Sequence, residues 1–360
     1  MADYAAVNGV AAAIIEKVNG VAKASVQAVN GATTPSSGAE KWGLAAQDAG
    51  IGYASSSDLT SWTTYETETT GTDFRTIAYG KDGSGSALWV VGWGKNPKEI
   101  IYSSDITGGS GSWTVVNLAG GVHDVCWGND VWIAVGNNTS SRKAVYRSTD
   151  GASWSEIDIS GETGVNTATI YTCANSGSQW LIAQEDRLYS SSDGQSWALA
   201  HDFNDSQTQI WDIKYTNSTW ILLIGRSGGG AGSGAYVRTA AASDVTDWSA
   251  EQDINIGQSA RRFAAGNGKA IFVYSNDHQL ATVSGKTCTL ATYTANQLPS
   301  AGARDIATDG STWVVVHDDG DISTSTDDGS NWTQSVNGLV IDANNPADLD
   351  SVAAAIYLPV

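Results

Sequence analysis

Basic residues are scarce in this chain. Its 360 residues include 19 Lys and Arg against 38 Asp and Glu, which gives a net charge of −19 at pH 7. Proteins bind nucleic acid largely by neutralising phosphates with Lys and Arg, so we expect no nucleic-acid partner. The same negative charge disfavours binding to anionic membrane surfaces.

Long apolar runs are also missing. No stretch approaches the ~20 consecutive apolar residues that a membrane-spanning helix needs, so we expect no membrane insertion. The first residues, Met1–Tyr4, have neither the basic start nor the apolar core of a secretory signal. The sequence therefore predicts synthesis and maturation in the cytoplasm.

Residue types that carry metal and catalytic chemistry are few. The 3 Cys and 4 His are spread along the chain without the spacing of metal ligands. Glu is rare, and no Gly-x-Gly-x-x-Gly lies between a strand and a helix. We therefore expect no metal, no cofactor and no catalytic residues. The acidic run Asp318–Asp321 is a weak candidate for Ca²⁺, and a solvated turn is the favoured interpretation.

Tryptophan, in contrast, is abundant and periodic, and most of the 15 Trp residues form two ladders. Members of one ladder mostly follow a Ser-x-Asp or Ser-Asp step, and a Cys takes the place of one member: Trp62, Trp113, Trp154, Trp197, Trp248, Cys288 and Trp332. Members of the other head short apolar runs: Trp42, Trp89, Trp132, Trp180, Trp220, Ala270 and Trp313. A period of about 40–50 residues with several short strands per unit is typical of β-propellers. We therefore predict an all-β fold, a seven-bladed β-propeller of four-stranded blades.

A recurring turn precedes the Trp of the first ladder. In Ser148–Trp154, Ser191–Trp197 and Ser325–Trp332, an Asp side chain is placed to accept from backbone N–H groups, and a Gly supplies a positive φ. The motif resembles the Asp-box, or BNR repeat, of sialidases, sortilin-type receptors and photosystem assembly factors. The resemblance covers roughly residues 41–358 and implies the propeller fold. It implies no activity, since the Asp-box is a folding device in those families.

The ring should close with its last strand. Most blades begin with a short inner strand, which the blade headed by Trp42 lacks, and Asp350–Ala354 matches the missing pattern. Closure of this kind removes exposed sheet edges. We predict a propeller over residues 39–360. Cys126 and Cys173 fall at one position of successive inner strands, so we expect packing rather than a disulfide.

The N-terminal segment has a different period. Val7-Asn8-Gly9, Val18-Asn19-Gly20 and Val29-Asn30-Gly31 recur every 11 residues, and Asn-Gly between β-branched residues favours a tight turn. Units this small need another chain to bury their apolar face. We predict that residues 1–38 form an anchor and linker. The repeats resemble those of structural proteins of marine and cyanobacterial tailed phages. The alternative is a helical or disordered leader.

Three arginines fall at equivalent starts of inner strands, namely Arg75, Arg261 and Arg304. Guanidinium groups gathered at the channel mouth would suit a carboxylate, a sulfate or an acidic glycan. Phe74–Ile77 resembles the Phe/Tyr-Arg-Ile-Pro motif of sialidases, but the Pro is missing and no Tyr–Glu nucleophile pair is evident. The favoured alternative is a structural network in which the arginines pair with Asp124, Asp212, Asp305 and Asp350.

From these features we expect a non-enzymatic virion protein of a tailed phage, such as a capsid decoration, tail fibre or other tail appendage. Its N-terminal repeats would bind other virion proteins, and its propeller would contact a host-surface glycan or receptor. Oligomerisation on the particle is expected. The alternatives are a sialidase-like glycoside hydrolase and an intracellular assembly factor.

Overall fold

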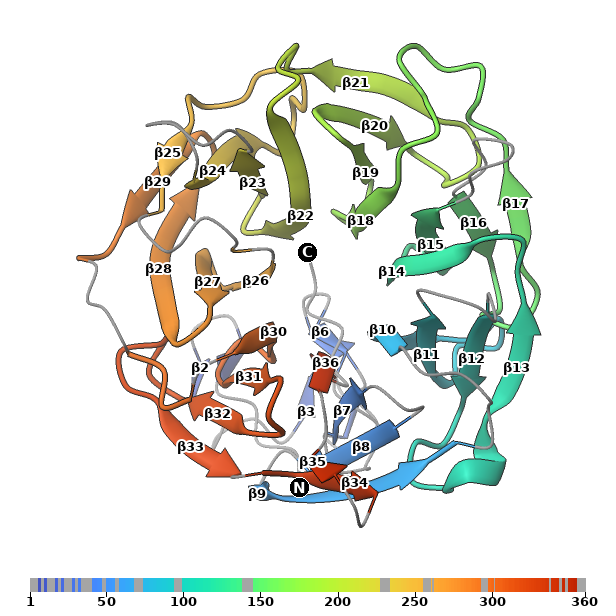
Figure 1. The fold of residues 1–360 in the computed structure, drawn as a ribbon, viewed down its shortest axis with the longest axis vertical. Coiled ribbons are helices and arrows are strands. Elements are labelled where there is room, and N and C mark those ends of the chain that lie inside the picture. Colours follow the sequence, from blue (N-terminus) through green and yellow to red (C-terminus); the bar gives the residue numbers. More distant parts are fainter. Residues whose placement is uncertain are drawn as a thin grey trace.

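The computed structural model describes residues 41–354, except residues 47–49, 56–57, 68–73, 94–98, 138–144, 227–233, 255–259, 261, 293–296, 301, 337, 343–344 and 347–348. It also describes three pairs of two-residue strands before residue 34. Seven four-stranded antiparallel sheets are arranged around a common centre as the blades of a propeller (Figure 1). The predicted fold class is confirmed.

Each blade runs from an inner strand, beside the centre, to an outer strand. Blade one comprises β36 (Leu349–Ala354), β7 (Lys41–Ala46), β8 (Gly50–Ser55) and β9 (Asp58–Glu66). Blade two comprises β10 (Phe74–Lys81), β11 (Ala87–Trp93), β12 (Glu99–Ser103) and β13 (Thr114–Asn117). Blade three comprises β14 (Gly121–Gly128), β15 (Val131–Asn137), β16 (Val145–Ser148) and β17 (Ser155–Ile157). Blade four comprises β18 (Ile170–Asn175), β19 (Trp180–Gln184), β20 (Arg187–Ser191) and β21 (Ala198–Asp202).

Blade five comprises β22 (Thr208–Thr216), β23 (Thr219–Arg226), β24 (Gly234–Ala241) and β25 (Gln252–Asp253). Blade six comprises β26 (Arg262–Gly266), β27 (Lys269–Tyr274), β28 (Asp277–Ser284) and β29 (Thr287–Leu290). Blade seven comprises β30 (Ala303–Thr308), β31 (Trp313–His317), β32 (Ile322–Ser325) and β33 (Thr333–Val336). Outside the blades lie a 3-10 turn, η3 (Ser110–Ser112), and the paired strands β34 (Val340–Asp342) and β35 (Asn345–Pro346).

The two ends of the ring share blade one, as predicted. Strand β36 pairs antiparallel with β7, with Val352 opposite Leu44 and Ala353 opposite Gly43. Figure 1 shows the red β36 beside the blue β7 at the centre of the ring. Closure therefore joins residues that are about 300 positions apart in the chain, which gives the last strand a large share of the ring's integrity.

The Trp-headed second strands form the core. Trp132, Trp180 and Trp220 are fully buried, and β19 and β31 are buried along their whole length. Side chains from neighbouring blades pack together, as where Ile133 of blade three meets Ile182 of blade four. The two faces of a second strand are covered by the preceding and the following blade, so the strand is buried on both faces, which explains its continuous apolar run.

The turns between third and fourth strands hold their Asp as expected. Asp150 Oδ1 accepts from the N–H groups of Ala152 at 2.9 Å and of Ser153 at 2.7 Å. Gly151 has φ +71°, and a Cβ there would lie 2.2 Å from a Leu88 methyl group, so no other residue fits without rearrangement. Trp154 Nε1 donates to the Gly151 carbonyl at 2.9 Å, which closes the turn.

Blade two varies this turn. Its insertion contains η3, and Trp113 Nε1 donates to the Tyr65 hydroxyl of blade one at 2.9 Å rather than to its own turn. The Trp thus keeps a partner for its indole N–H even where the turn is longer.

The N-terminal strands pair as β1 (Ala6–Val7) with β2 (Val10–Ala11), β3 (Lys17–Val18) with β4 (Val21–Ala22), and β5 (Ala28–Val29) with β6 (Ala32–Thr33). Each pair flanks one Asn-Gly step, as the tight-turn signal predicts. Of the residues assigned to the anchor, Val7, Val18 and Val29 lie in these strands. The others, Asn8, Gly9, Asn19, Gly20, Asn30 and Gly31, lie outside the described residues.

Candidate functional site

Six of the seven inner strands carry an irregularity near their start among the described residues, and this positions a ring of side chains. The pairing skips one residue between Phe74 and Thr76 in β10, and the same skip recurs in five other inner strands. The skipped residues are Arg75, His123, Tyr171, Trp211, Arg304 and Asp350. Because a bulge re-aims its side chain, the first five of these line one cavity at the mouth of the central channel.

The mouth has a volume of about 570 Å³. On one side, three rings from blades three, four and five form an aromatic arc of His123, Tyr171 and Trp211. The ring centroids of His123 and Tyr171 are 5.3 Å apart, and those of Tyr171 and Trp211 are 4.9 Å apart. Such tilted, edge-on contacts between rings are favourable, and all three side chains line the cavity.

The other side of the mouth is basic. Arg75, Arg262 and Arg304 line it, together with one acidic side chain, Asp318. A guanidinium nitrogen of Arg304 lies 3.6 Å from a carboxylate oxygen of Asp318, so this pair is nearly neutral. Arg75 Nε is buried and has no hydrogen-bond partner among the described residues. Burial, and then the charges of Arg75 and Arg262, lower the pKa of His123 to about 4.

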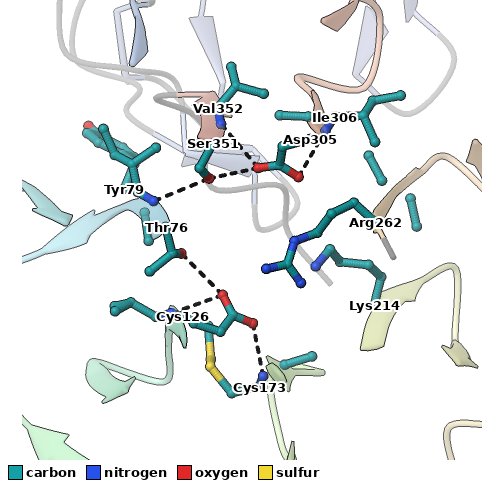
Figure 2. Close-up of a pocket in the computed structure, with 18 of the residues that line it drawn as sticks. Thr76, Tyr79, Cys126, Cys173, Lys214, Arg262, Asp305, Ile306, Ser351 and Val352 are labelled. Atoms are coloured by element: carbon teal, nitrogen blue, oxygen red, sulfur yellow. Dashed lines mark hydrogen bonds between the residues drawn. A yellow bond between two sulfur atoms is a disulfide. The ribbon is translucent and has the colours of Figure 1, made fainter. Parts of the chain in front are cut away.

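Beneath the mouth, a collar of side chains encircles the channel. It consists of the residues that follow the bulge and of their counterpart in β26: Ser351, Thr76, Asp124, Thr172, Asp212, Arg262 and Asp305. Figure 2 shows Asp305 receiving hydrogen bonds from Ser351 and Val352, with the tips of Arg262 and Lys214 pointing into the channel.

Each carboxylate of the collar accepts hydrogen bonds from backbone N–H groups of two neighbouring blades. Asp305 Oδ1 accepts from the Ile306 N–H of its own blade at 2.9 Å, and its Oδ2 accepts from the Val352 N–H of blade one at 3.1 Å. Asp124 does the same for Val125 and Cys173, and Asp212 for Ile213 and Phe263. Inner-strand N–H groups that face a channel have no neighbouring strand to bind them. The carboxylate oxygens take the place of the carbonyl acceptors that such a strand would supply.

Seven blades present seven such N–H groups, and three carboxylates bind six of them. The seventh, Ile77 N–H, donates to the Ser351 hydroxyl at 3.4 Å, and that hydroxyl donates to Asp305 at 2.7 Å. Hydroxyls also donate from Thr76 to Asp124 at 3.3 Å and from Thr172 to Asp212 at 3.2 Å. The collar therefore links neighbouring blades around the ring.

Below the collar, the channel widens into a chamber of about 320 Å³. Small side chains line it, including Ala78, Ala264 and Ala307, and among the described lining residues Lys214 is the one long basic side chain below the collar. Lys214 Nζ lies 2.6 Å from Asp212 Oδ1; burial alone would lower the pKa of Lys214, but Asp212 and Asp124 outweigh it and raise this pKa. Burial raises the pKa values of Asp124 and Asp305.

The chamber wall contains a disulfide between Cys126 of blade three and Cys173 of blade four, with Cα atoms 6.2 Å apart. The prediction that these cysteines only pack is therefore wrong. Cys126 pairs with Ile133, one residue after Trp132, whereas Cys173 pairs with Ile182, two residues after Trp180. The two cysteines are thus offset by one position, which lets one sulfur reach across to the other.

The predicted arginine site is partly assembled. Arg75 and Arg304 line the same mouth, whereas Arg261 lies outside the described residues, and its neighbour Arg262 occupies the mouth and collar. Of the predicted interactions between arginines and the channel aspartates, the charge of Arg262 lowers the pKa values of Asp124 and Asp305 against the effect of burial. Asp212 is bound by a cation that was not predicted, Lys214. The aromatic arc was missed, although Trp211 and His123 follow the same alignment as Arg75.

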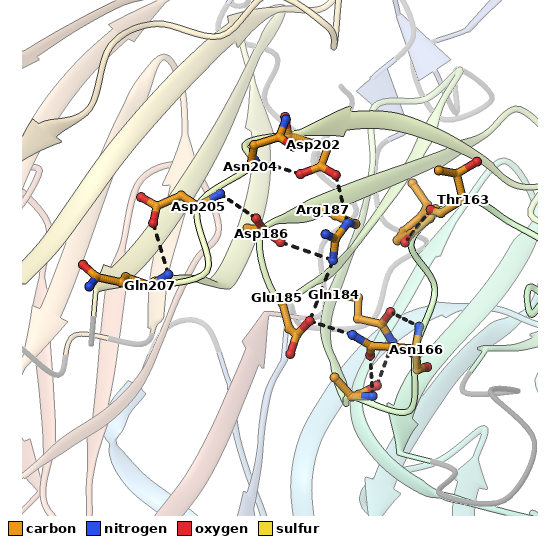
Figure 3. A network of polar contacts seen from close by, with 12 residues as sticks. Thr163, Asn166, Gln184, Glu185, Asp186, Arg187, Asp202, Asn204, Asp205 and Gln207 are labelled. Carbon is orange, nitrogen blue, oxygen red and sulfur yellow. Dashed lines mark hydrogen bonds and ion pairs between the residues drawn. The ribbon is translucent and has the colours of Figure 1, made fainter. Parts of the chain in front are cut away.

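Two other polar clusters have structural roles. Figure 3 shows Arg187 between Asp186 and Asp202, with N–O distances of 3.4 Å and 3.0 Å. In the acidic run, Asp321 is buried and accepts from Ser300 and from the Gly338 N–H, so the expected solvated turn is wrong for this residue.

Across the described residues, no group of His, Cys, Asp and Glu is arranged to hold a metal ion. Nor does any helix in that part of the chain have the length and apolar character to span a membrane.

Comparisons with known proteins place the chain by fold. No family model matches it, and no curated protein matches its sequence. Similar solved structures include YCF48 bound to a D1 peptide (TM-score 0.52, 13% identity, 76% of this chain and 85% of that one). YCF48 from Cyanidioschyzon merolae is similar too (TM-score 0.53, 12% identity, 72% and 84%). So is the computationally designed Ika8 protein (TM-score 0.53, 9% identity, 86% and 88%). At these identities the likeness is one of fold: the chain is a seven-bladed β-propeller.

Proposed function

We propose that this chain is a non-enzymatic structural protein of a tailed-phage virion, which displays its propeller to bind an acidic ligand on the host surface. The observation that carries the ligand-binding part is the mouth, where an aromatic arc faces Arg75 and Arg262. In a chain of net charge −19, a cavity lined by cations and aromatic rings is a local exception that favours a specific anionic ligand.

The lining chemistry supports binding over catalysis. A glycosidase needs two placed carboxylates, or a Tyr–Glu pair with an acid/base carboxylate. The described residues that line the mouth include no Glu, and their one Asp, Asp318, pairs with Arg304. The deeper carboxylates of Asp124, Asp212 and Asp305 are engaged by backbone N–H groups. A sialidase-like hydrolase is therefore the less favoured candidate.

The virion part rests on the N-terminal repeats. The pairs β1–β2, β3–β4 and β5–β6 recur with the 11-residue period and are too small to bury an apolar face alone. This favours docking on other virion proteins, in a capsid decoration, tail fibre or tail appendage that carries several copies.

The Asp-holding turns, which support the Asp-box resemblance, lie on the face of the propeller opposite the mouth, because successive strands of a blade are antiparallel.

An intracellular assembly factor that binds peptides is the second alternative. One structure of the same fold is of YCF48 bound to a D1 peptide. The likeness extends to the fold alone, and the mouth offers a peptide little backbone pairing, because the seven collar N–H groups already have acceptors.

The test compares the full chain with a chain starting at Ala39. All blade strands lie within residues 41–354, so the shorter chain retains the complete ring. We expect the full chain to oligomerise and to bind phage particles. The shorter chain should be a monomer that does not bind them. If both are monomers without affinity for particles, the virion assignment is wrong.

A further inference from the structure

We infer that the ligand of the mouth is the terminal acidic sugar of a glycan, inserted end-on with its carboxylate or sulfate group against Arg75 and Arg262. This inference rests on the proposed binding function and adds the ligand class, its orientation and the residues that hold it. Three features of the mouth carry it.

The first feature is depth. The mouth and the chamber share Arg75 and Arg262, which places these two side chains at the floor of the mouth, beside the collar. The tips of Arg262 and Lys214 point into the channel (Figure 2), and the mouth and the chamber are separate cavities, so the channel narrows between them. A ligand that reaches the two arginines must therefore enter by its end, whereas an internal sugar of a chain would remain above them.

The second feature is the environment of Arg75. Arg304 lies beside Asp318, and the charge of Arg262 acts on the collar carboxylates Asp124 and Asp305, whereas Arg75 has no ion pair among the described side chains. Its Nε is buried and lacks a hydrogen-bond acceptor there. A buried guanidinium N–H without an acceptor favours an anion, because a charge-assisted hydrogen bond restores what burial removes.

The third feature distinguishes a sugar from a peptide. An acidic peptide end would need backbone partners, but the inner-strand N–H groups at the collar are all bound by Asp124, Asp212, Asp305 and Ser351. The side chains of Tyr171 and Trp211 line the cavity and supply aromatic surface instead, which suits the C–H face of a pyranose. The cavity of about 570 Å³ lies in the range of small-ligand sites.

The experiment measures binding of the full-length protein to immobilised oligosaccharides of one backbone. One arm ends in a neutral sugar, one in a carboxylated sugar and one in a sulfated sugar. In a fourth arm, the acidic sugar is internal and covered by a neutral sugar. We expect binding to at least one acid-terminated arm, at least 10-fold stronger than to the neutral and the covered arms. The comparison of the carboxylated and sulfated arms identifies the anionic group.

Variants locate the site. We expect Arg75→Gln and Trp211→Ala each to weaken binding at least 10-fold. Arg147→Gln is the matched control, because Arg147 contacts the Asp193 carbonyl at the opposite end of the blades, and it should leave binding unchanged. Circular dichroism and thermal unfolding of each variant separate loss of binding from loss of fold.

Three results would overturn the inference: equal binding of neutral and acidic arms, equal binding of the covered arm, or full binding by Arg75→Gln. Preferential binding of an acidic peptide series would replace the sugar by a peptide. Each of these leaves the particle-association test untouched, so failure of the ligand class and failure of the virion role are distinguishable.

Discussion

Replacing Asp305 by Ala tests the collar most directly. The substitution leaves the N–H groups of Ile306 and Val352 without acceptors, and both residues are more than nine-tenths buried. It also removes the acceptor of the Ser351 hydroxyl. Val352 belongs to the strand that closes the ring, so one of the broken hydrogen bonds joins the last blade to the seam between the chain ends.

The expected magnitude follows from these hydrogen bonds. A buried donor left without a partner costs about 1–3 kcal/mol, so two such N–H groups cost about 2–6 kcal/mol. Burial raises the pKa of Asp305, which means that holding its ionised carboxylate costs some stability at neutral pH, and removing it offsets part of the loss. Water that enters from the chamber can accept from the freed N–H groups, which offsets a further part of the lost free energy. We expect a net loss of about 3 kcal/mol, or roughly 5 °C in Tm for a chain of this size.

Asp82→Ala is the matched control. Asp82 also accepts two backbone N–H groups and one hydroxyl, from Ser84 and Ser86, but in a turn beside solvent where water replaces it. We expect this variant to lose less than about 1 kcal/mol. Urea unfolding followed by tryptophan fluorescence measures both variants. Equal losses in the two would refute the argument that the Asp305 carboxylate holds neighbouring blades together.

Further predictions concern closure, the disulfide and pH. Deleting residues 349–360 removes β36, and calorimetry should show a sharply lowered and broadened transition; an unchanged transition would contradict closure by this strand. Replacing Cys126 and Cys173 by Ala should cost about 2–4 kcal/mol in denaturant unfolding, and free thiols found by mass spectrometry of the native protein would argue against the bond. Because the pKa of His123 is lowered from 6.5 to about 4, the unfolded chain takes up a proton first as pH falls. Stability should therefore drop by on the order of 3 kcal/mol from pH 6.5 to pH 4, and His123→Gln should remove that component of the pH dependence.

The features that could be predicted from sequence are those marked by large buried side chains that recur at regular intervals. Trp132 and Trp180 recur because each second strand is enclosed by two blades, and large buried side chains leave a visible period. The closing strand was found for a similar reason, since the apolar pattern around Val352 matches that of other inner strands.

The features that were missed depend on shifts of one residue. A bulge adds one residue to a strand without changing its composition, so aligned sequences place Ile170 rather than Tyr171 at the mouth. Because the sequence does not show where the bulge lies, Cys173 was aligned with Cys126, and the disulfide between them was not predicted. Hydrogen bonds of the collar leave no periodic signal, because their acceptors are Asp in some blades and hydroxyl residues in others.

The odd number of blades makes one seam of the ring different from the rest. A carboxylate has two oxygens and serves two blades, so an even ring could be completed by carboxylates alone, but seven blades leave one N–H over. That N–H belongs to Ile77, and its acceptor is the neutral hydroxyl of Ser351 at 3.4 Å, on the strand that the chain adds last. The weakest link of the collar thus coincides with the joint between the chain ends. Local opening should begin there, and the Ile77 amide should exchange with deuterium faster than its six counterparts.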